Sequence, residues 1–266
     1  MKRILLGLIA ILFLLNGCEY LGSDPTPPPA PVDGLINVSI IEAYEDYNKI
    51  GYPSFYLRMF TEKDYPCFNY KILSDIKISG PEINVSVMGV SLPGNICLTA
   101  LGPATSLDKL SLSEGDYKLI INDNQVISAY NVSVTKSYIS FDKTASGSTI
   151  VKSKLRWRYP DNSFVYMCGT LTQDSVICND FLDTVKSKIS LSEFTFPDSG
   201  AIPYASVSQG HYYDMPAKYF LYQSELDFNK IEGILKDYKE KYLINKKGYG
   251  ISIINWLNKT VYSWLL

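Results

Sequence analysis

Residues 36–40 read Ile-Asn-Val-Ser-Ile, with apolar and polar side chains alternating at every position. Successive side chains of a β-strand point to opposite faces, so this alternation predicts a strand with one buried face. Similar runs, separated by turn residues, follow at residues 55–60, 83–90, 117–122, 125–135 and 137–141. Seven or eight strands within about 110 residues, with no helix of ten residues, predict an antiparallel β-sandwich over residues 35–142.

The segment 112–119, Leu-Ser-Glu-Gly-Asp-Tyr-Lys-Leu, resembles the tyrosine corner of immunoglobulin-like domains. In that corner a glycine permits a tight turn, and a tyrosine two residues later hydrogen-bonds to the backbone upstream. Gly115 and Tyr117 stand at those two positions. Leu119 occupies the place of the second sheet-bridging cysteine of antibody domains, and no tryptophan lies between residues 35 and 140. The resemblance therefore implies the broader immunoglobulin-like or fibronectin-like architecture.

Residues 143–149 are small and polar and predict a linker between two domains. The second domain, residues 150–266, is expected to be α+β, with an antiparallel sheet and one long helix, so that the whole chain is mainly β. Residues 227–243 carry apolar side chains at steps of three and four, which predicts the long helix. The remaining expected elements are a short helix at 180–189, strands at 154–159, 164–168 and 218–222, and a hairpin over 251–264.

The N-terminus has the organisation of a signal peptide. Lys2 and Arg3 precede an uninterrupted apolar run of 12 residues, from position 4 to position 15. This run is too short for a transmembrane helix, which needs about 20 residues, and it suits the central region of a cleaved signal.

The run ends in Leu15-Asn16-Gly17-Cys18, which resembles the lipobox of bacterial lipoproteins. The resemblance implies removal of residues 1–17, attachment of a diacylglyceryl group to Cys18, and anchoring in a membrane of the bacterial cell envelope. Glu19 follows the cysteine, a pattern that in enterobacterial-type sorting implies delivery to the outer membrane. An ordinary cleaved signal and an uncleaved anchor with an incidental cysteine are the alternatives.

Residues 18–34 contain five prolines among Ser, Asp, Thr and Gly. Such a composition is typical of an extended, polyproline-like segment. We expect it to act as a tether between the lipid anchor and the folded part of the chain.

The chain has five cysteines, and assignment of Cys18 to the lipid leaves four in an oxidising compartment. The expected disulfides are Cys67–Cys97 and Cys168–Cys178, because each pair then lies within one predicted domain. Four buried free thiols are the alternative.

Charge and motif content exclude several classes of function. The chain has 25 Lys and Arg against 27 Asp and Glu, a net charge of −2, which argues against a nucleic-acid partner. Its single histidine, His211, excludes a site that needs two imidazoles. Phosphate-binding loops, dinucleotide-binding glycine motifs, nucleophile elbows and His-Glu-x-x-His motifs are all absent from the sequence, so neither a cofactor nor a metal is expected.

Two groups of residues are candidates for a site. His211 with Asp214 could provide a general base and its orienting carboxylate, or His211 could contact a ligand or belong to a structural loop. Trp157, Tyr159, Tyr212 and Tyr213 could form an aromatic face for a glycan or a protein partner. Half-buried aromatic side chains of strands are the alternative explanation for the second group.

The leading hypothesis is a non-enzymatic, membrane-anchored lipoprotein that serves as a binding, adhesion or scaffold module. The sandwich would act as spacer and the α+β domain as the recognition part. The alternatives are a cell-envelope hydrolase acting on glycan or peptide through His211 and Asp214, and an accessory subunit of an envelope complex.

Substitution of Cys18→Ser removes the thiol that would carry the lipid, so we expect this variant to move from the membrane fraction to the soluble fraction. Cell fractionation against the wild-type chain measures this. A variant that still sediments with membranes contradicts the anchor.

Overall fold

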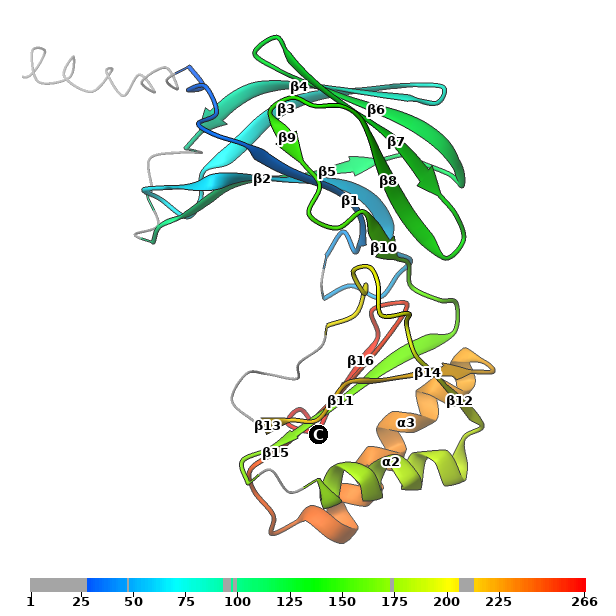
Figure 1. Cartoon of the computed structure of the whole chain (residues 1–266). Helices are drawn as coiled ribbons and strands as arrows, with labels where there is room; N and C mark the ends of the chain where they lie inside the picture. Colours follow the sequence, from blue (N-terminus) through cyan, green and yellow to red (C-terminus); the bar gives the residue numbers. More distant parts are fainter. Residues whose placement is uncertain (1–27, 47, 93–96, 98–99, 173–174, 206–212) are drawn as a thin grey trace, which may run out of the picture.

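The computed structural model describes residues 28–46, 48–92, 97, 100–172, 175–205 and 213–266 (Figure 1). The described chain is mainly β and forms two units, a large curled sheet and a smaller sheet with two α-helices. The predicted signal peptide, Cys18 and most of the tether lie outside the described residues, as do His211 and Tyr212.

The large sheet has ten strands in the order β10-β8-β7-β6-β4-β3-β5-β2-β1-β9. Side chains from both halves of this curled sheet, among them Val38, Leu57, Ile83 and Leu119, share one apolar core. The bounds of the strands are β1 (Ile36–Ala43), β2 (Ser54–Tyr65), β3 (Lys71–Ser79), β4 (Glu82–Ser91), β5 (Gly102–Leu110), β6 (Gly115–Asp123), β7 (Val126–Val134), β8 (Tyr138–Ala145), β9 (Thr149–Ile150) and β10 (Leu155–Trp157).

The two edge strands of this sheet, β9 and β10, are separated by only four residues of chain. β9 pairs in parallel with β1, and β10 pairs antiparallel with β8. One short segment therefore hydrogen-bonds to both ends of the curled sheet. This pairing leaves fewer exposed strand edges, which are a liability in open sheets.

The segment predicted as a linker, residues 143–149, belongs largely to this sheet. Residues 143–145 continue β8, and Thr149 begins β9. The Tyr130 hydroxyl approaches the Thr149 hydroxyl to 2.8 Å and donates to the Thr149 carbonyl at 2.9 Å. The small, polar composition suggested a linker, because the hydrogen bonds of Thr149 to a buried tyrosine 19 residues away leave no local sequence pattern.

The strands expected at 154–159 and 164–168, both in the second domain, are present as β10 and β11 (Ser163–Thr170), but they belong to different sheets. β10 extends the large sheet by pairing with β8, whereas the next strand, β11, lies at the centre of the smaller sheet. The Pro160-Asp161-Asn162 turn thus carries the chain from one unit to the other. Local alternation identified the strands but not their partners.

The smaller sheet has the order β12-β14-β11-β15-β16, with β13 also paired to β11. All eight residues of β11 are buried, as expected for a central strand covered on both faces. The predicted C-terminal hairpin is confirmed by the pairing of β15 with β16. The bounds of the other strands are β12 (Leu191–Phe194), β13 (Tyr213–Asp214), β14 (Lys218–Tyr222), β15 (Tyr249–Asn255) and β16 (Thr260–Tyr262).

Two helices cover one face of this sheet (Figure 1). The helix predicted at 180–189 is present as α2 (Val176–Lys188), but it begins four residues earlier and is nearly as long as α3 (Glu225–Tyr238), so the second unit has two helices of similar length rather than one long helix. Its buried residues Phe181, Leu182 and Val185 form a second apolar stripe that packs in the same core as α3. α3 is followed by a π-helical turn over Lys239–Leu243, which shortens the predicted α-helix at its C-terminal end.

Both predicted disulfides are confirmed. Cys67 is bonded to Cys97 with a Cα–Cα distance of 5.2 Å, and Cys168 to Cys178 with a Cα–Cα distance of 5.8 Å. The second bond joins β11 to α2 and thereby fixes a helix to the central strand of its sheet.

The C-terminal end of the proline-rich segment is attached to the large sheet. The amide of Ala30 donates to the carbonyl of Val90 at 2.8 Å, and the amide of Val90 donates back to Ala30 at 2.7 Å. Gly89 permits this approach, because its φ is +124° and a Cβ atom there would lie 2.3 Å from the Ala30 carbonyl oxygen.

Gly89→Ala should therefore lower the free energy of unfolding by about 1–3 kcal/mol, since it combines backbone strain with a clash against Ala30. Gly233→Ala is the matched control, because a Cβ atom at this helical position meets nothing within 4 Å. Alanine is the better helix former, so the control should raise stability by about 0.5–1 kcal/mol. Urea denaturation measures both, and equal effects would contradict the assigned contact.

Candidate functional site

A buried ion pair holds the end of β1 against the residue that follows β10, where the chain leaves the large sheet. The Glu42 carboxylate accepts hydrogen bonds from Arg158 Nε at 2.8 Å and from the backbone amide of Tyr159 at 3.0 Å. The side chains of Glu42 and Arg158 are only 6% and 19% exposed. Arg158 also donates to the Thr135 carbonyl and stands 5.0 Å from the centroid of the Phe55 ring. Breaking a buried pair leaves an uncompensated charge, so this contact strongly holds the start of the connection to the second unit against β1.

A second contact joins the β1–β2 connection to the turn between β15 and β16. The Tyr44 hydroxyl donates to the Trp256 carbonyl at 2.8 Å, and the Gly51 amide donates to the Leu257 carbonyl at 2.9 Å. The ring of Tyr52 meets the Trp256 ring edge-on at 5.3 Å. These backbone and ring contacts hold the units together away from the ion pair.

A third contact extends the edge of the large sheet with residues from the second unit. The Ala201 amide donates to the Leu155 carbonyl at 2.9 Å, and the Trp157 amide donates to the Ala201 carbonyl at 2.8 Å. The indole N–H of Trp157 donates to the Ser199 carbonyl at 2.8 Å. β10 is therefore paired on both sides, by β8 and by this loop.

Between these contacts lies a cleft of about 500 Å³, which we call the interunit cleft. The large sheet contributes Glu114, Lys136 and Ser137, and the second unit contributes Phe194–Pro197 and Leu221, with residues 157–161 between them. Lys136 and Asp161 form an exposed ion pair of 3.4 Å at this cleft. Charges of both signs thus stand beside aromatic rings.

Trp157 and its neighbours supply the aromatic part of the cleft. The Trp157 ring lies edge-on to Tyr138 at 6.0 Å and tilted against Phe196 at 6.4 Å. Phe194 and Phe196 meet edge-on at 5.3 Å. All of these rings are half-buried, so each is held by packing and keeps part of its surface exposed.

Tyr159 lines the cleft, but most of its side-chain contacts are with residues that connect the two units. Its hydroxyl donates to the Pro203 carbonyl at 2.9 Å, and its ring packs against Tyr204 and Tyr44. Burial raises the pKa of Tyr159 to about 12, against the lowering effect of a hydrogen bond with Tyr44, and the nearby Glu42 charge raises it further. Tyr159 therefore stays a neutral hydrogen-bond donor at physiological pH.

The predicted aromatic face is only partly assembled. Trp157 and Tyr159 share the interunit cleft, whereas Tyr213 is 59% exposed and pairs with Thr170, at the far end of β11 from Ser163. Seven strand steps of about 3.4 Å separate the two ends of β11. Tyr213 is therefore not part of the cleft, and Tyr212 lies outside the described residues.

The predicted pair of His211 and Asp214 is not tested by the described residues. His211 lies outside them, and Asp214 belongs to β13, where its backbone pairs with Gly169 of β11. The pair stays a prediction.

Sequence reasoning missed Lys136, Phe194 and Phe196 as parts of the cleft. Phe194 and Phe196 alternate in a Phe-Thr-Phe run, which is the one local signal that could have drawn attention to them. Lys136 lies in the β7–β8 turn and has no such signal.

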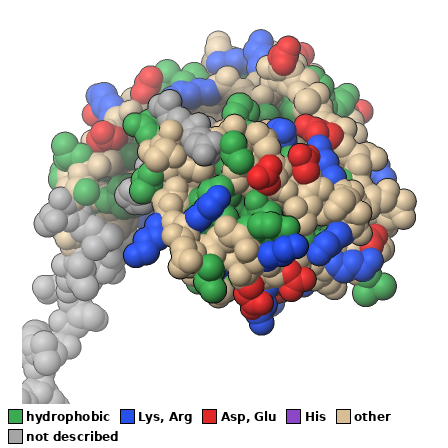
Figure 2. Space-filling view, turned by 90° about the horizontal axis from the view of Figure 1, so that it is seen from below, with side chains coloured by type: hydrophobic (Ala, Val, Ile, Leu, Met, Phe, Trp, Pro, Cys, Tyr) green, Lys and Arg blue, Asp and Glu red, His purple; other side chains and the backbone are tan. Residues whose placement is uncertain are grey.

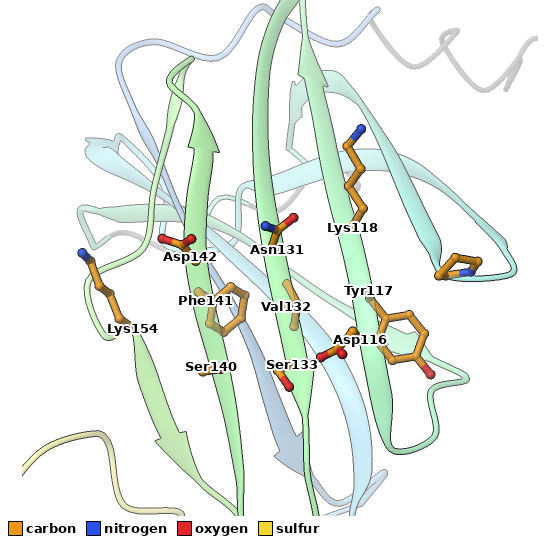
Figure 3. A pocket seen from close by; sticks show the side chains of 11 residues that line it. Asp116, Tyr117, Lys118, Asn131, Val132, Ser133, Ser140, Phe141, Asp142 and Lys154 are labelled. Atoms are coloured by element: carbon orange, nitrogen blue, oxygen red, sulfur yellow. The ribbon is translucent and has the colours of Figure 1, made fainter.

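A wider hollow of about 760 Å³ lies over β6, β7 and β8 (Figure 3). Lys118, Asn131 and Asp142 stand side by side across these strands, because the register pairs each with the next. Val132 and Phe141 are buried on the opposite side of the sheet. This open polar surface is typical of a solvated sheet face.

Charged side chains of both signs are intermixed on the face of the molecule seen in Figure 2. Across the described residues, no group of three or more His, Cys, Asp or Glu side chains is arranged to hold a metal ion. A helix with the length and apolarity needed to cross a membrane is likewise not found in the described part of the chain.

No family model, curated protein or solved structure matches this chain.

Glu42→Ala should lower the free energy of unfolding by about 3 kcal/mol, because the largely buried charge of Arg158 would keep only the exposed Glu114 as an ion-pair partner among the described residues. Lys63→Ala is the matched control, since its ion pair with Asp33 joins side chains that are 59% and 70% exposed. Exposed pairs contribute less than about 1 kcal/mol. Chemical denaturation compares the two, and a Glu42→Ala effect as small as that of the control would contradict the role of the buried pair.

Proposed function

We propose that this protein is a lipid-anchored binding protein of the bacterial cell envelope. The large sheet serves as an immunoglobulin-like spacer, and the interunit cleft binds a glycan or peptide chain. The observation that carries the proposal is the position of Trp157, Phe194 and Phe196, whose partly exposed rings line one cleft together with charged side chains.

The properties of the interunit cleft support binding. Its volume of about 500 Å³ lies within the range of small-molecule sites. Aromatic side chains bury a large area at a low cost in conformational entropy, and they suit the flat faces of sugars and the side chains of peptides. The exposed Lys136 and Asp161 can orient polar groups of the ligand at the rim.

A hydrogen-bond pattern supports the immunoglobulin-like assignment of the spacer. The Tyr117 hydroxyl donates to the Ser113 carbonyl at 3.0 Å and accepts from the Ser113 amide at 3.1 Å. This is the upstream backbone contact that a tyrosine corner makes. Gly115 has a φ of +153°, consistent with the turn that the corner needs.

The attachment of Ala30 to Val90 supports a tether that ends at the large sheet. The proline-rich residues before it would then connect the sheet to the lipid at Cys18. In this arrangement the large sheet carries the anchor-proximal end, and the interunit cleft lies at the junction with the second unit.

The cleft is tested by calorimetric titration of the protein with soluble peptidoglycan fragments, which carry both glycan and peptide. Trp157→Ala should weaken binding by about tenfold or more, as truncation of a central aromatic contact does in other interfaces. Lys136→Glu reverses the charge of an exposed side chain at the rim of the cleft. It should also weaken binding of these fragments, without disturbing the apolar core of the large sheet. Trp264→Ala, a surface tryptophan that is 40% exposed outside the cleft, is the matched control.

Separate titrations with a chitin oligosaccharide and with the stem peptide alone assign the contact to glycan or to peptide. Binding that survives both cleft substitutions, or no binding of any of the three probes, contradicts the proposal.

A further inference from the structure

Three cationic side chains gather near the closure of the large sheet without acidic partners. Arg58 of β2 and Lys152 of the segment between β9 and β10 both stand over the Phe60 ring, at 5.4 and 5.6 Å from its centroid. Arg156 of β10 lines the same small cavity as Arg58. In the described part of the chain, no carboxylate forms an ion pair with any of the three, although the other arginine of this region, Arg158, has two.

Two of these cations line a small cavity of about 190 Å³. Arg58 and Arg156 share it with the apolar side chains of Ile41 and Ile139. Arg156 is half-buried, and its burial, followed by the charge of Arg58, lowers the pKa of its guanidinium from the ordinary value. Two like charges at a partly buried cavity are unfavourable unless an anion lies between them.

Glu42 also lines this cavity, but its carboxylate is already bound by Arg158 and by the Tyr159 amide. One of its carboxylate oxygens accepts from Arg158 Nε and the other accepts from the Tyr159 amide. The charge of Glu42 is thereby balanced by Arg158, and the charges of Arg58 and Arg156 are not balanced within the cavity.

We propose that Arg58 and Arg156, assisted by Lys152, form a binding site for a phosphate group. Guanidinium groups bind phosphate oxygens through pairs of parallel hydrogen bonds, and an ammonium group adds a point charge. A phosphate carries a charge approaching −2 and three or four acceptor oxygens, which matches two arginines at the cavity, with Lys152 beside Arg58, better than a singly charged carboxylate does. The apolar walls of Ile41 and Ile139 reduce the local dielectric constant and strengthen these contacts.

The site is distinct from the interunit cleft, although Trp157 lines both. Arg58 comes from β2, whereas Arg156 comes from β10, the strand that closes the sheet and precedes the second unit. A phosphate held by both would add a link between these two strands beside the Glu42–Arg158 pair.

The test is calorimetric titration of the full chain with inorganic phosphate, with sodium chloride at equal ionic strength as the reference. Arg156→Gln and Arg58→Gln should each weaken phosphate binding by about tenfold or more, because each removes charge-assisted hydrogen bonds. Arg58 is exposed, so its variant keeps the test informative if Arg156→Gln disturbs folding. Lys77→Gln, which removes one positive charge from an exposed ion pair on β3, should leave binding unchanged.

A second titration, with glycerol 3-phosphate, distinguishes a site for the free phosphate ion from a site for a phosphate ester. Binding of inorganic phosphate alone indicates a site for the free ion, and binding of the ester indicates a site for a phosphorylated headgroup or sugar. In either case the proposal requires that the two arginine variants lose the signal. No binding of either compound, or binding that Lys77→Gln weakens as much as the arginine variants do, overturns it.

Discussion

The ion pair between Glu42 and Arg158 fixes the point where the chain leaves the large sheet, and both proposed sites lie beside this point. Glu42 lies at the end of β1, and Arg158 follows β10, at the point where the chain leaves the large sheet. Each oxygen of the carboxylate has its own donor, so the pair is satisfied although it is buried. A buried pair contributes little net stability, but it is costly to break, and it therefore selects one relative placement of the groups that carry it. Arg158 lines the interunit cleft and Glu42 lines the small cationic cavity, so the pair lies between the two.

The segment from Thr149 to Trp157 connects most of the other features. It pairs with β1 at its start and with β8 at its end, so it meets both edges of the large sheet. Its last residue, Trp157, contributes a ring to the cleft while its backbone is bonded to Ala201 of the second unit. Arg156 within it faces the cavity that Arg58 also lines. The two proposed sites are neighbours because one short stretch of chain joins the two units.

The parts of the fold that were foreseen are those with a strong local pattern. Alternation located β1, β4 and the β6–β7 hairpin, and the apolar spacing of Phe228, Ile231 and Leu235 located α3, whose buried face includes all three. β5 was not predicted because it begins with Gly102-Pro103, which is typical of a turn, and because its pairing with the distant β2 holds it in place.

Of the residues that line the interunit cleft, Trp157 and Tyr159 were predicted from the aromatic composition of the second domain. Lys136 and Phe196 were not, since nothing local indicates that a β7–β8 turn and a loop after β12 approach the same tryptophan.

The sequence by itself determined the strand-rich character of the chain, the apolar stripe of α3, the pairing of cysteines within each half, and the resemblance to a lipoprotein signal. These properties depend on residue type and short spacing, which are local. Tertiary structure alone decided that β10 belongs to the first sheet rather than to the sheet of β11, and that residues 143–145 and 149 of the predicted linker lie in strands. It also decided that Arg158 is neutralised by Glu42 while Arg58 and Arg156 are not. The partner of a strand depends on which strand edges are unpaired in the folded protein, and the partner of a charge depends on which groups are buried beside it. Glu42 and Arg158 are 116 residues apart, so a local sequence pattern cannot identify them as partners.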